Sequence, residues 1–152
     1  MAKYVASGAA GAASTTAATA GILKLDNPSA STMAAAKIYE WEIGPAANSA
    51  DETYLVQAKR QSTAGTWTAV TPSPLDAKTG ASVTTAGRAS TAAGTAGVVL
   101  GQWGFHMRGG YRWVAIPGGE LVVPLTFSNG IILEYVFAQG TSVLNGSIFF
   151  DE

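Results

Sequence analysis

The sequence predicts an all-β protein: a single jelly-roll-like antiparallel β-sandwich with an extended N-terminal arm and a long low-complexity loop. Short apolar or alternating segments follow one another, separated by Gly, Pro, Asn and Ser, and no long window has apolar residues at helical spacing. Because strands do not alternate with helices, a parallel sheet is not expected, and a sandwich or barrel remains. An immunoglobulin-like sandwich is the second choice.

The length and the composition divide the chain into an arm and one domain. A chain of about 150 residues can bury roughly 70% of its unfolded surface, so these 152 residues suit a single core. We place the β-sandwich domain at residues 22–152 and interpret residues 1–21, mostly Ala, Gly, Ser and Thr, as a flexible or docking arm. Residues 76–96 have a similar composition and are expected to form a long surface loop, because few large apolar side chains offset the entropy of ordering it.

Eight segments are predicted to be strands. In the first of them, Glu40 and Glu42 share one face with Ile38, while the aromatic residues between them share the other. This alternation is typical of a half-buried strand whose aromatic face points inward. The eight segments are residues 38–43, 53–61, 66–70, 97–105, 111–116, 120–127, 131–139 and 141–152.

Two pairs of these segments are predicted to be hairpins. The short stretch "STAG" joins 53–61 to 66–70, and Pro117-Gly118-Gly119 joins 111–116 to the strand that follows. In the second pair, Glu120 beside the turn is expected to be solvated or paired with Arg112. Pro124 lacks a backbone donor, so the strand that contains it is expected to be an edge strand or to carry a bulge.

The low charge excludes several partners. Charged residues make up 12% of the chain, against a usual value of about 25%, and the net charge is −1. The nine Lys and Arg residues are scattered, so no nucleic-acid partner is expected. No apolar run reaches the roughly 18 residues of a membrane span, and the N-terminus lacks the hydrophobic middle of a signal peptide, so we expect an intracellular product with no membrane partner. A surface so poor in charge favours coverage by other subunits.

The residues that usually carry chemistry are scarce. His106 is the sole histidine and there is no cysteine, so a histidine-rich or thiolate metal site is not expected. No Gly-x-Ser-x-Gly motif accompanies His106, which we interpret as a surface or strand-end residue. Glu40 and Glu42 are expected on a solvated strand face, roughly 7 Å apart at Cα. No catalytic residue, cofactor or metal ligand is therefore predicted.

The aromatic residues are more informative. Those inside alternating strands are expected in the core: Trp41, Trp67 and Trp113. Three others flank the segment "HMRGG", and core packing, a protein–protein interface and a carbohydrate-stacking platform all remain open for them. These residues are Trp103, Phe105 and Tyr111.

Several stretches together resemble one known family. The most specific is Arg112-Trp113 followed by Pro-Gly-Gly-Glu and an apolar strand, and the full set is "YEWEIG" (39–44), "TAVTPSPLDA" (68–77), "YRWVAIPGGELVVP" (111–124), "SNGI" (128–131) and "GSIFFDE" (146–152). Through them residues 37–152 resemble the decoration, or cement, proteins of tailed-bacteriophage capsids.

This resemblance implies a non-enzymatic jelly roll that is made in the host cytoplasm, forms a homotrimer and sits on the capsid surface of the virion. There it would bridge subunits of the major capsid protein and stabilise the shell. The residues that we expect at these contacts are Tyr4, Val5, Trp103, Phe105, Arg108, Tyr111, Arg112 and Glu120. The alternative is a carbohydrate- or receptor-binding jelly-roll module of a phage tail or fibre. A surface-layer or pilin-like subunit and an enzyme are weaker alternatives.

Overall fold

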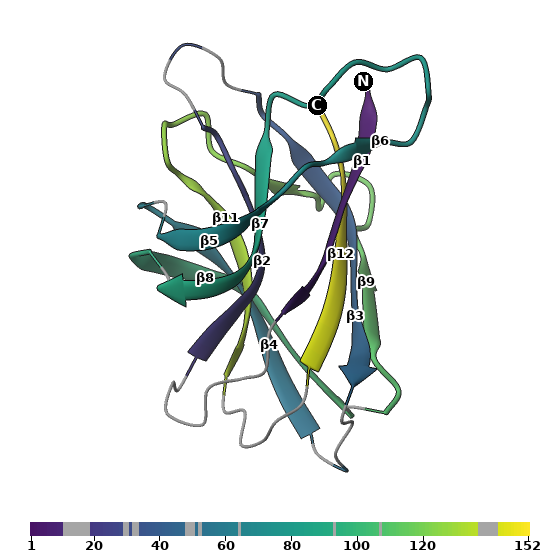
Figure 1. The fold of residues 1–152 in the computed structure, drawn as a ribbon, viewed down its shortest axis with the longest axis vertical. Coiled ribbons are helices and arrows are strands. Elements are labelled where there is room, and N and C mark those ends of the chain that lie inside the picture. Colours follow the sequence, from purple (N-terminus) through teal and green to yellow (C-terminus); the bar gives the residue numbers. More distant parts are fainter. Residues whose placement is uncertain are drawn as a thin grey trace.

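The computed structural model describes residues 1–10, 19–28, 31, 34–47, 51, 53–63, 65–92, 94–106, 108–136 and 143–152. These residues form strands and no helix, so the protein is all-β as the sequence predicts (Figure 1). No helix in the described part of the chain is long and apolar enough to span a membrane. The strands are β1 (Lys3–Ala10), β2 (Thr19–Asp26), β3 (Lys37–Ala47), β4 (Thr53–Gln61), β5 (Thr66–Val70), β6 (Ser73–Pro74), β7 (Thr85–Ala92), β8 (Ala96–His106), β9 (Tyr111–Val114), β10 (Leu121–Val122), β11 (Gly130–Val136) and β12 (Val143–Asp151).

Two antiparallel sheets pack face to face, which confirms the predicted antiparallel sandwich. Sheet A has the order β10-β3-β12-β1-β6, with β9 also beside β3, and sheet B has the order β5-β7-β2-β11-β4-β8. The first and last strands, β1 and β12, lie side by side inside sheet A (Figure 1). The backbones of Ala2 and Glu152 also exchange two hydrogen bonds, of 3.0 and 3.1 Å. The two ends of the chain therefore meet at one end of the sandwich.

The segment that we expected to be an N-terminal arm contains a strand of the sheet. β1 pairs with β12 over its whole length, and Tyr4 and Ala6 of β1 are 4% and 1% exposed. Their two-residue spacing places both side chains on the inner face of the sheet. Over residues 3–10 the arm prediction is therefore wrong, because β12 supplies the hydrogen-bond partners and the core supplies the burial. Residues 11–18 lie outside the described part.

The predicted loop at 76–96 is also partly a strand. Residues 85–92 form β7, which pairs with β2 and with β5, and β8 begins at residue 96. The preceding residues are tied to sheet A. The carboxylate of Glu152 accepts hydrogen bonds from the backbone N–H groups of Val83 and Thr84, at 2.7 and 3.1 Å, and from the Thr84 hydroxyl at 2.7 Å. This segment is ordered despite its small side chains because β2, β5 and Glu152 supply its hydrogen-bond partners.

The predicted hairpin between 53–61 and 66–70 does not form. Both strands exist with the predicted bounds, as β4 and β5. However, β4 pairs with β11 on one side and with β8 on the other, while β5 pairs with β7. Since both edges of β4 are occupied, the chain crosses the whole of sheet B between these two strands.

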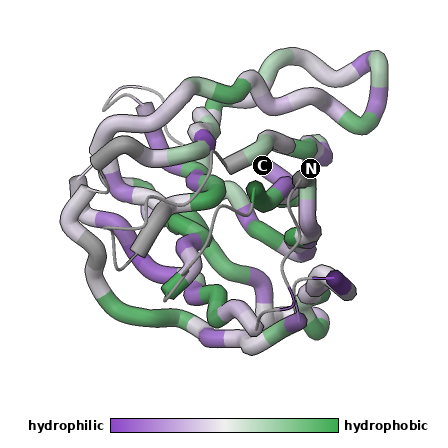
Figure 2. Tube along the Cα trace, turned by 60° about the horizontal axis from the view of Figure 1, so that its bottom comes forward, coloured by the Kyte–Doolittle hydropathy of each residue, from purple (hydrophilic) through white to green (hydrophobic). Residues whose placement is uncertain are grey.

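The inner faces of the two sheets form the core. In β4, Tyr54, Val56 and Ala58 are 2% exposed or less, as their two-residue spacing along the strand predicts. From sheet A, Trp41 faces them at 0% exposure. Figure 2 shows hydrophobic and hydrophilic stretches interspersed along the described chain. Each large apolar side chain buried in this way contributes roughly 1.5–3 kcal/mol by leaving water, which makes this core the main source of stability.

A bulge in β3 changes which of its residues share a face. Consecutive residues of β12 pair with Glu40 and Ile38, so Tyr39 is the extra residue. Ile38 therefore points into the core with Trp41 and is 0% exposed. The simple alternation predicted Ile38 on the outer face beside Glu40, and the bulge is the reason that this prediction is wrong.

Trp67 lies on the outer face of sheet B instead of in the core. A Cβ atom built on Gly87 would lie 2.7 Å from Trp67 Cβ, and one built on Gly21 would overlap the indole ring. The two glycines therefore allow the indole to lie against β2 and β7. The Lys24 ammonium lies 5.9 Å from the centroid of the indole, on the same face.

Candidate functional site

The free edge of sheet A is a single interrupted strand. β9 and β10 both pair with β3 and run in the same direction along it, with Val114 opposite Glu40 and Leu121 opposite Ile38. The two segments that we predicted to be a hairpin therefore follow one another beside the same strand, and that prediction is wrong. The edge position that Pro124 suggested is confirmed, because β10 ends the described sheet.

Residues 116–120 form a loop that leaves this edge strand and returns to it. The Gly119 N–H donates to the Ile116 carbonyl at 2.8 Å, and Gly118 has a φ of +83°, which glycine adopts without steric cost. Glu120 accepts a hydrogen bond from the Gly118 N–H at 3.2 Å. Hydrogen bonds from the backbone N–H groups of Glu120 itself and of Gly118, with Lys37 nearby, hold the pKa of Glu120 below its ordinary value. Glu120 thus stabilises the loop.

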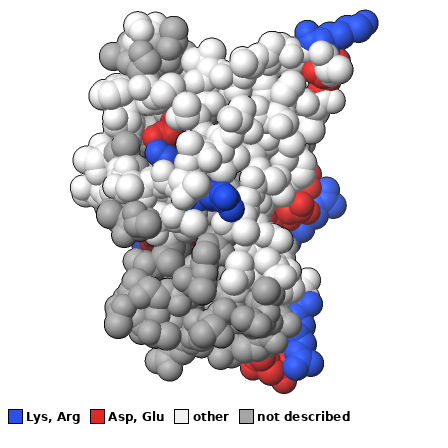
Figure 3. Space-filling model, viewed as in Figure 1, with Lys and Arg blue, Asp and Glu red and all other residues white. Residues whose placement is uncertain are grey.

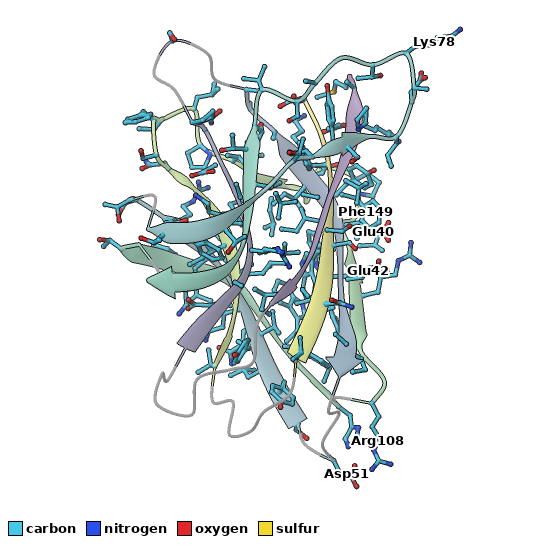
Figure 4. The ribbon with its side chains drawn as sticks, in the orientation of Figure 1. Glu40, Glu42, Asp51, Lys78, Arg108 and Phe149 are labelled. Atoms are coloured by element: carbon cyan, nitrogen blue, oxygen red, sulfur yellow. The ribbon has the colours of Figure 1, made fainter. Side chains whose placement is uncertain are left out.

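Arg112 pairs with Glu40, and not with Glu120. Its Nε donates to Glu40 Oε1 at 2.6 Å, and this hydrogen bond, with the charge of Glu40 and then of Glu42, raises the pKa of the guanidinium. Glu40 and Glu42 point away from the sandwich on the outer face of sheet A, as the sequence predicts (Figure 4). Arg112 and Glu40 therefore form a tight ion pair on this face, with the Glu42 carboxylate as a further charge beside Arg112.

Both sheets end on one flank in a strand with exposed aliphatic side chains. Among the described strands, β8 ends sheet B and β9–β10 ends sheet A, and Trp103 of β8 lies 6.0 Å from Trp113 of β9 between ring centroids. We call these two edges, with the 116–120 loop, the edge flank. Its exposed aliphatic residues are Val98 (69%), Val99 (44%), Val114 (53%), Ile116 (76%) and Val122 (40%). Edge strands with apolar side chains are templates for pairing with another chain unless they are covered.

The aromatic residues around "HMRGG" point into the sandwich. The ring centroids of Trp103 and Tyr111, both half-buried, lie 5.0 and 5.4 Å from that of Trp41. Phe105 is 6% exposed and packs 6.2 Å from Tyr54. Of the three interpretations left open by the sequence, core packing fits these positions. An exposed stacking platform does not, because the ring faces are covered by other rings.

The predicted contact residues of β1 face opposite sides of sheet A. Tyr4 is buried, and its hydroxyl donates to the Gly80 carbonyl at 3.2 Å. Burial, and then the charge of Glu152, raises the pKa of Tyr4. Val5 is half-buried on the outer face, in the same row as Phe149. Of this pair, Val5 alone is accessible to a partner.

Arg108 lies at one end of the molecule, close to Asp51 (Figure 4). Asp51 Oδ1 is 2.8 Å from His106 Nε2 and 3.8 Å from Arg108 Nε. His106 is exposed at the end of β8, which confirms its interpretation as a strand-end residue. The eight predicted contact residues are thus divided among the core, the outer face of sheet A and this end, and do not form one surface.

A groove of about 410 Å³ lies on the outer face of sheet A, beside Arg112. Its floor includes Gly44 of β3, where an added Cβ atom would meet nothing within 4 Å. Glu42, Asn145 and Ser147 line it with polar groups. Sequence reasoning did not find this groove, because its lining comes from residues 42–45, 109–112 and 145–147 and none of these segments carries a signal by itself.

No group of three or more His, Asp or Glu residues in the described part of the chain is placed to hold a metal ion. No protein-family model, curated protein or solved structure matches the chain. Two features of the molecule are therefore left to suggest a function: the apolar edge flank and the polar groove.

Proposed function

We propose that this protein is a non-enzymatic structural component of a phage virion. It binds the outside of the capsid as a homotrimer and stabilises the shell by bridging subunits of the major capsid protein. The observation that carries the proposal is the edge flank, where each of the two sheets ends in a strand with exposed aliphatic side chains. The resemblance of residues 37–152 to capsid decoration proteins supports the same assignment.

The strand order supports a jelly roll as the finer description of the fold. Successive strands of the two halves of the chain pair as in one long hairpin: β1 with β12, β2 with β11, β3 with β9 and β10, and β4 with β8. Rolling such a hairpin brings β12 beside β3 and β11 beside β4, and both pairs are present. Two four-stranded sheets made in this way define a jelly roll. β5, β6 and β7 extend its edges opposite the edge flank.

The surface chemistry favours protein partners over nucleic acid or membranes. On the face seen in Figure 3, most charged side chains lie along one rim, and most of the remaining described surface is uncharged. Such a surface lacks the clustered positive charge that phosphate groups require. It can be covered by protein at little cost in lost solvation of charges.

Trimerisation would bury the edge flank, and the trimer would bind the capsid by multivalent contact. Burying the five aliphatic side chains, which are about half exposed, would contribute roughly 1 kcal/mol each before the cost of association. A trimer that contacts several capsid subunits at once gains about 10²–10⁴-fold in avidity without new types of contact. Modest surfaces on each protomer would then be sufficient to hold the protein on the shell.

The proposal is tested by placing a charge on the edge flank. Ile116→Asp should convert the trimer into monomers in analytical ultracentrifugation, because a carboxylate buried in an apolar contact costs several kcal/mol. Leu75→Asp is the matched control: Leu75 is 51% exposed and follows β6, at the opposite edge of sheet A. A wild-type protein that sediments as a monomer, or equal loss of trimer in both variants, would contradict the assignment of this surface.

A further inference from the structure

We propose that the groove on the outer face of sheet A binds a neutral saccharide. This goes beyond capsid decoration and does not depend on it. The groove has a volume of about 410 Å³, which falls in the range of about 300–1,000 Å³ that is usual for small-molecule sites. Its space exists because position 44 is a glycine, and the position that a Cβ atom would take there has no other atom within 4 Å.

The side chains around the groove can both donate and accept hydrogen bonds. Glu42 and Asn145 are exposed and line the groove, and the charge of Glu42 acts on Arg112. Arg112, which also lines the groove, is bound to Glu40 through Nε, and its two terminal nitrogens are further donors. Ser147 Oγ accepts a hydrogen bond from Ser7 Oγ at 3.0 Å and keeps its own proton to donate. Carboxylate, guanidinium, amide and hydroxyl groups together match the closely spaced hydroxyls of a sugar, each of which donates and accepts.

The charges of the groove disfavour an anionic ligand. Glu40 and Glu42 outnumber Arg112, so the group carries a net charge of −1 when all three are ionised. A phosphate or sulfate group would be repelled by the carboxylates of Glu40 and Glu42. A neutral ligand avoids this repulsion.

The strand pairing disfavours an extended peptide. The floor of the groove consists of β3 and β12, and each of these strands is already paired on both sides: β3 with β12 and β9, and β12 with β1 and β3. Their backbone N–H and C=O groups are therefore not free to add another strand. Recognition must come from the side chains, which again fits a polyhydroxyl ligand.

The experiment fills the groove and leaves the sheet intact. Saturation-transfer NMR and calorimetry would test maltose, cellobiose, lactose and diacetylchitobiose against the wild-type protein and Gly44→Val, with inorganic phosphate as the anionic probe. Neither Gly44 nor Gly80 has a positive φ, and a Cβ atom at either position meets nothing within 4 Å. Gly80→Val is therefore the matched control. Asn145→Ala, at an exposed position, removes one polar group without filling the space.

We expect at least one disaccharide to bind, with a dissociation constant on the order of 1 mM. Gly44→Val and Asn145→Ala should weaken binding at least tenfold, whereas Gly80→Val should leave it unchanged. Urea unfolding of each variant would establish that the fold is intact. The proposal is overturned if no disaccharide binds, if Gly44→Val binds as well as the wild type, or if inorganic phosphate displaces the sugar.

Discussion

Asn27 is the side chain whose removal should most clearly reveal how the loops beside the edge strand are held. It is 0% exposed, and its Nδ2 donates to the carbonyls of Pro124 at 2.6 Å and of Ala34 at 3.3 Å. Its Oδ1 accepts a hydrogen bond from the Ala34 N–H at 3.0 Å. One amide therefore joins the end of β2, the approach to β3 and the segment after β10.

Asn27→Ala would remove all three hydrogen bonds and leave the backbone groups of Ala34 and Pro124 without this partner. Each bond is worth about 1 kcal/mol net, so the free energy of unfolding should fall by about 3 kcal/mol. With a urea dependence of about 2 kcal/mol per M, the unfolding midpoint should fall by about 1.5 M. Tryptophan fluorescence would follow the transition, because Trp41 and its neighbouring rings lie in the core.

Ser147→Ala is the control for this experiment. It removes the Ser7–Ser147 hydrogen bond, which is exposed, and should change the free energy of unfolding by less than about 0.5 kcal/mol. If Asn27→Ala changed the free energy of unfolding no more than Ser147→Ala does, the Asn27 amide would not hold these loops, and the prediction would be refuted.

Three further predictions concern other parts of the fold. Gly87→Val should lower the free energy of unfolding, measured with urea, by about 1–3 kcal/mol, because the added Cβ atom would lie 2.7 Å from Trp67 Cβ. Gly97→Val, whose Cβ atom would lie 3.4 Å from the nearest atom, should lower it less. Burial, with Tyr54 nearby, raises the pKa of Tyr135 from 10.0 to about 12. Because the phenol then ionises at a lower pH in the unfolded chain than in the folded protein, its contribution to the free energy of unfolding should be fully present below pH 10 and be lost as the pH rises toward about 12. A urea midpoint that stays constant over this range would contradict the prediction. Glu152→Ala should speed tryptic cleavage after exposed Lys78, because it removes three hydrogen bonds to the 83–84 backbone and Thr84; an unchanged rate would show that this carboxylate does not restrain the loop.

Strands with large side chains on one face could be predicted from the sequence. β4 has the predicted bounds because Tyr54, Val56 and Ala58 recur at every second residue, and this period determines both the conformation and the inward face. β7 was missed for the opposite reason. Apart from Arg88 it consists of small residues, and the large side chain of Trp67 packs against its Gly87 from another strand. A single segment does not contain that information.

Strand partners were harder to predict than the strands. Short turns suggested two hairpins, but both edges of β4 are taken by distant strands, and β9 and β10 continue along the same edge of β3. In both cases burial of the core faces outweighs the proximity of neighbouring segments in the chain. The bulge at Tyr39 is a similar case, since one extra residue turned Ile38 inward.

The candidate site was predicted only in part. The outward direction of Glu40 and Glu42 followed from the alternation in β3. The groove did not, because Gly44, Arg112 and Asn145 come from three distant segments that meet when β3 pairs with both β9 and β12. The ion pair of Arg112 was missed for the same reason, because its partner Glu40 lies on the neighbouring strand but 72 positions away in the chain.

The most direct test of the proposed function joins two measurements on one sample. The mass of the free protein is measured by sedimentation, and the protein is then mixed with phage capsid shells that lack it and sedimented again. We expect a trimer that binds the shells saturably, with Ile116→Asp losing the trimer and most of the binding. A monomeric protein that stays in the supernatant with intact shells would contradict the account.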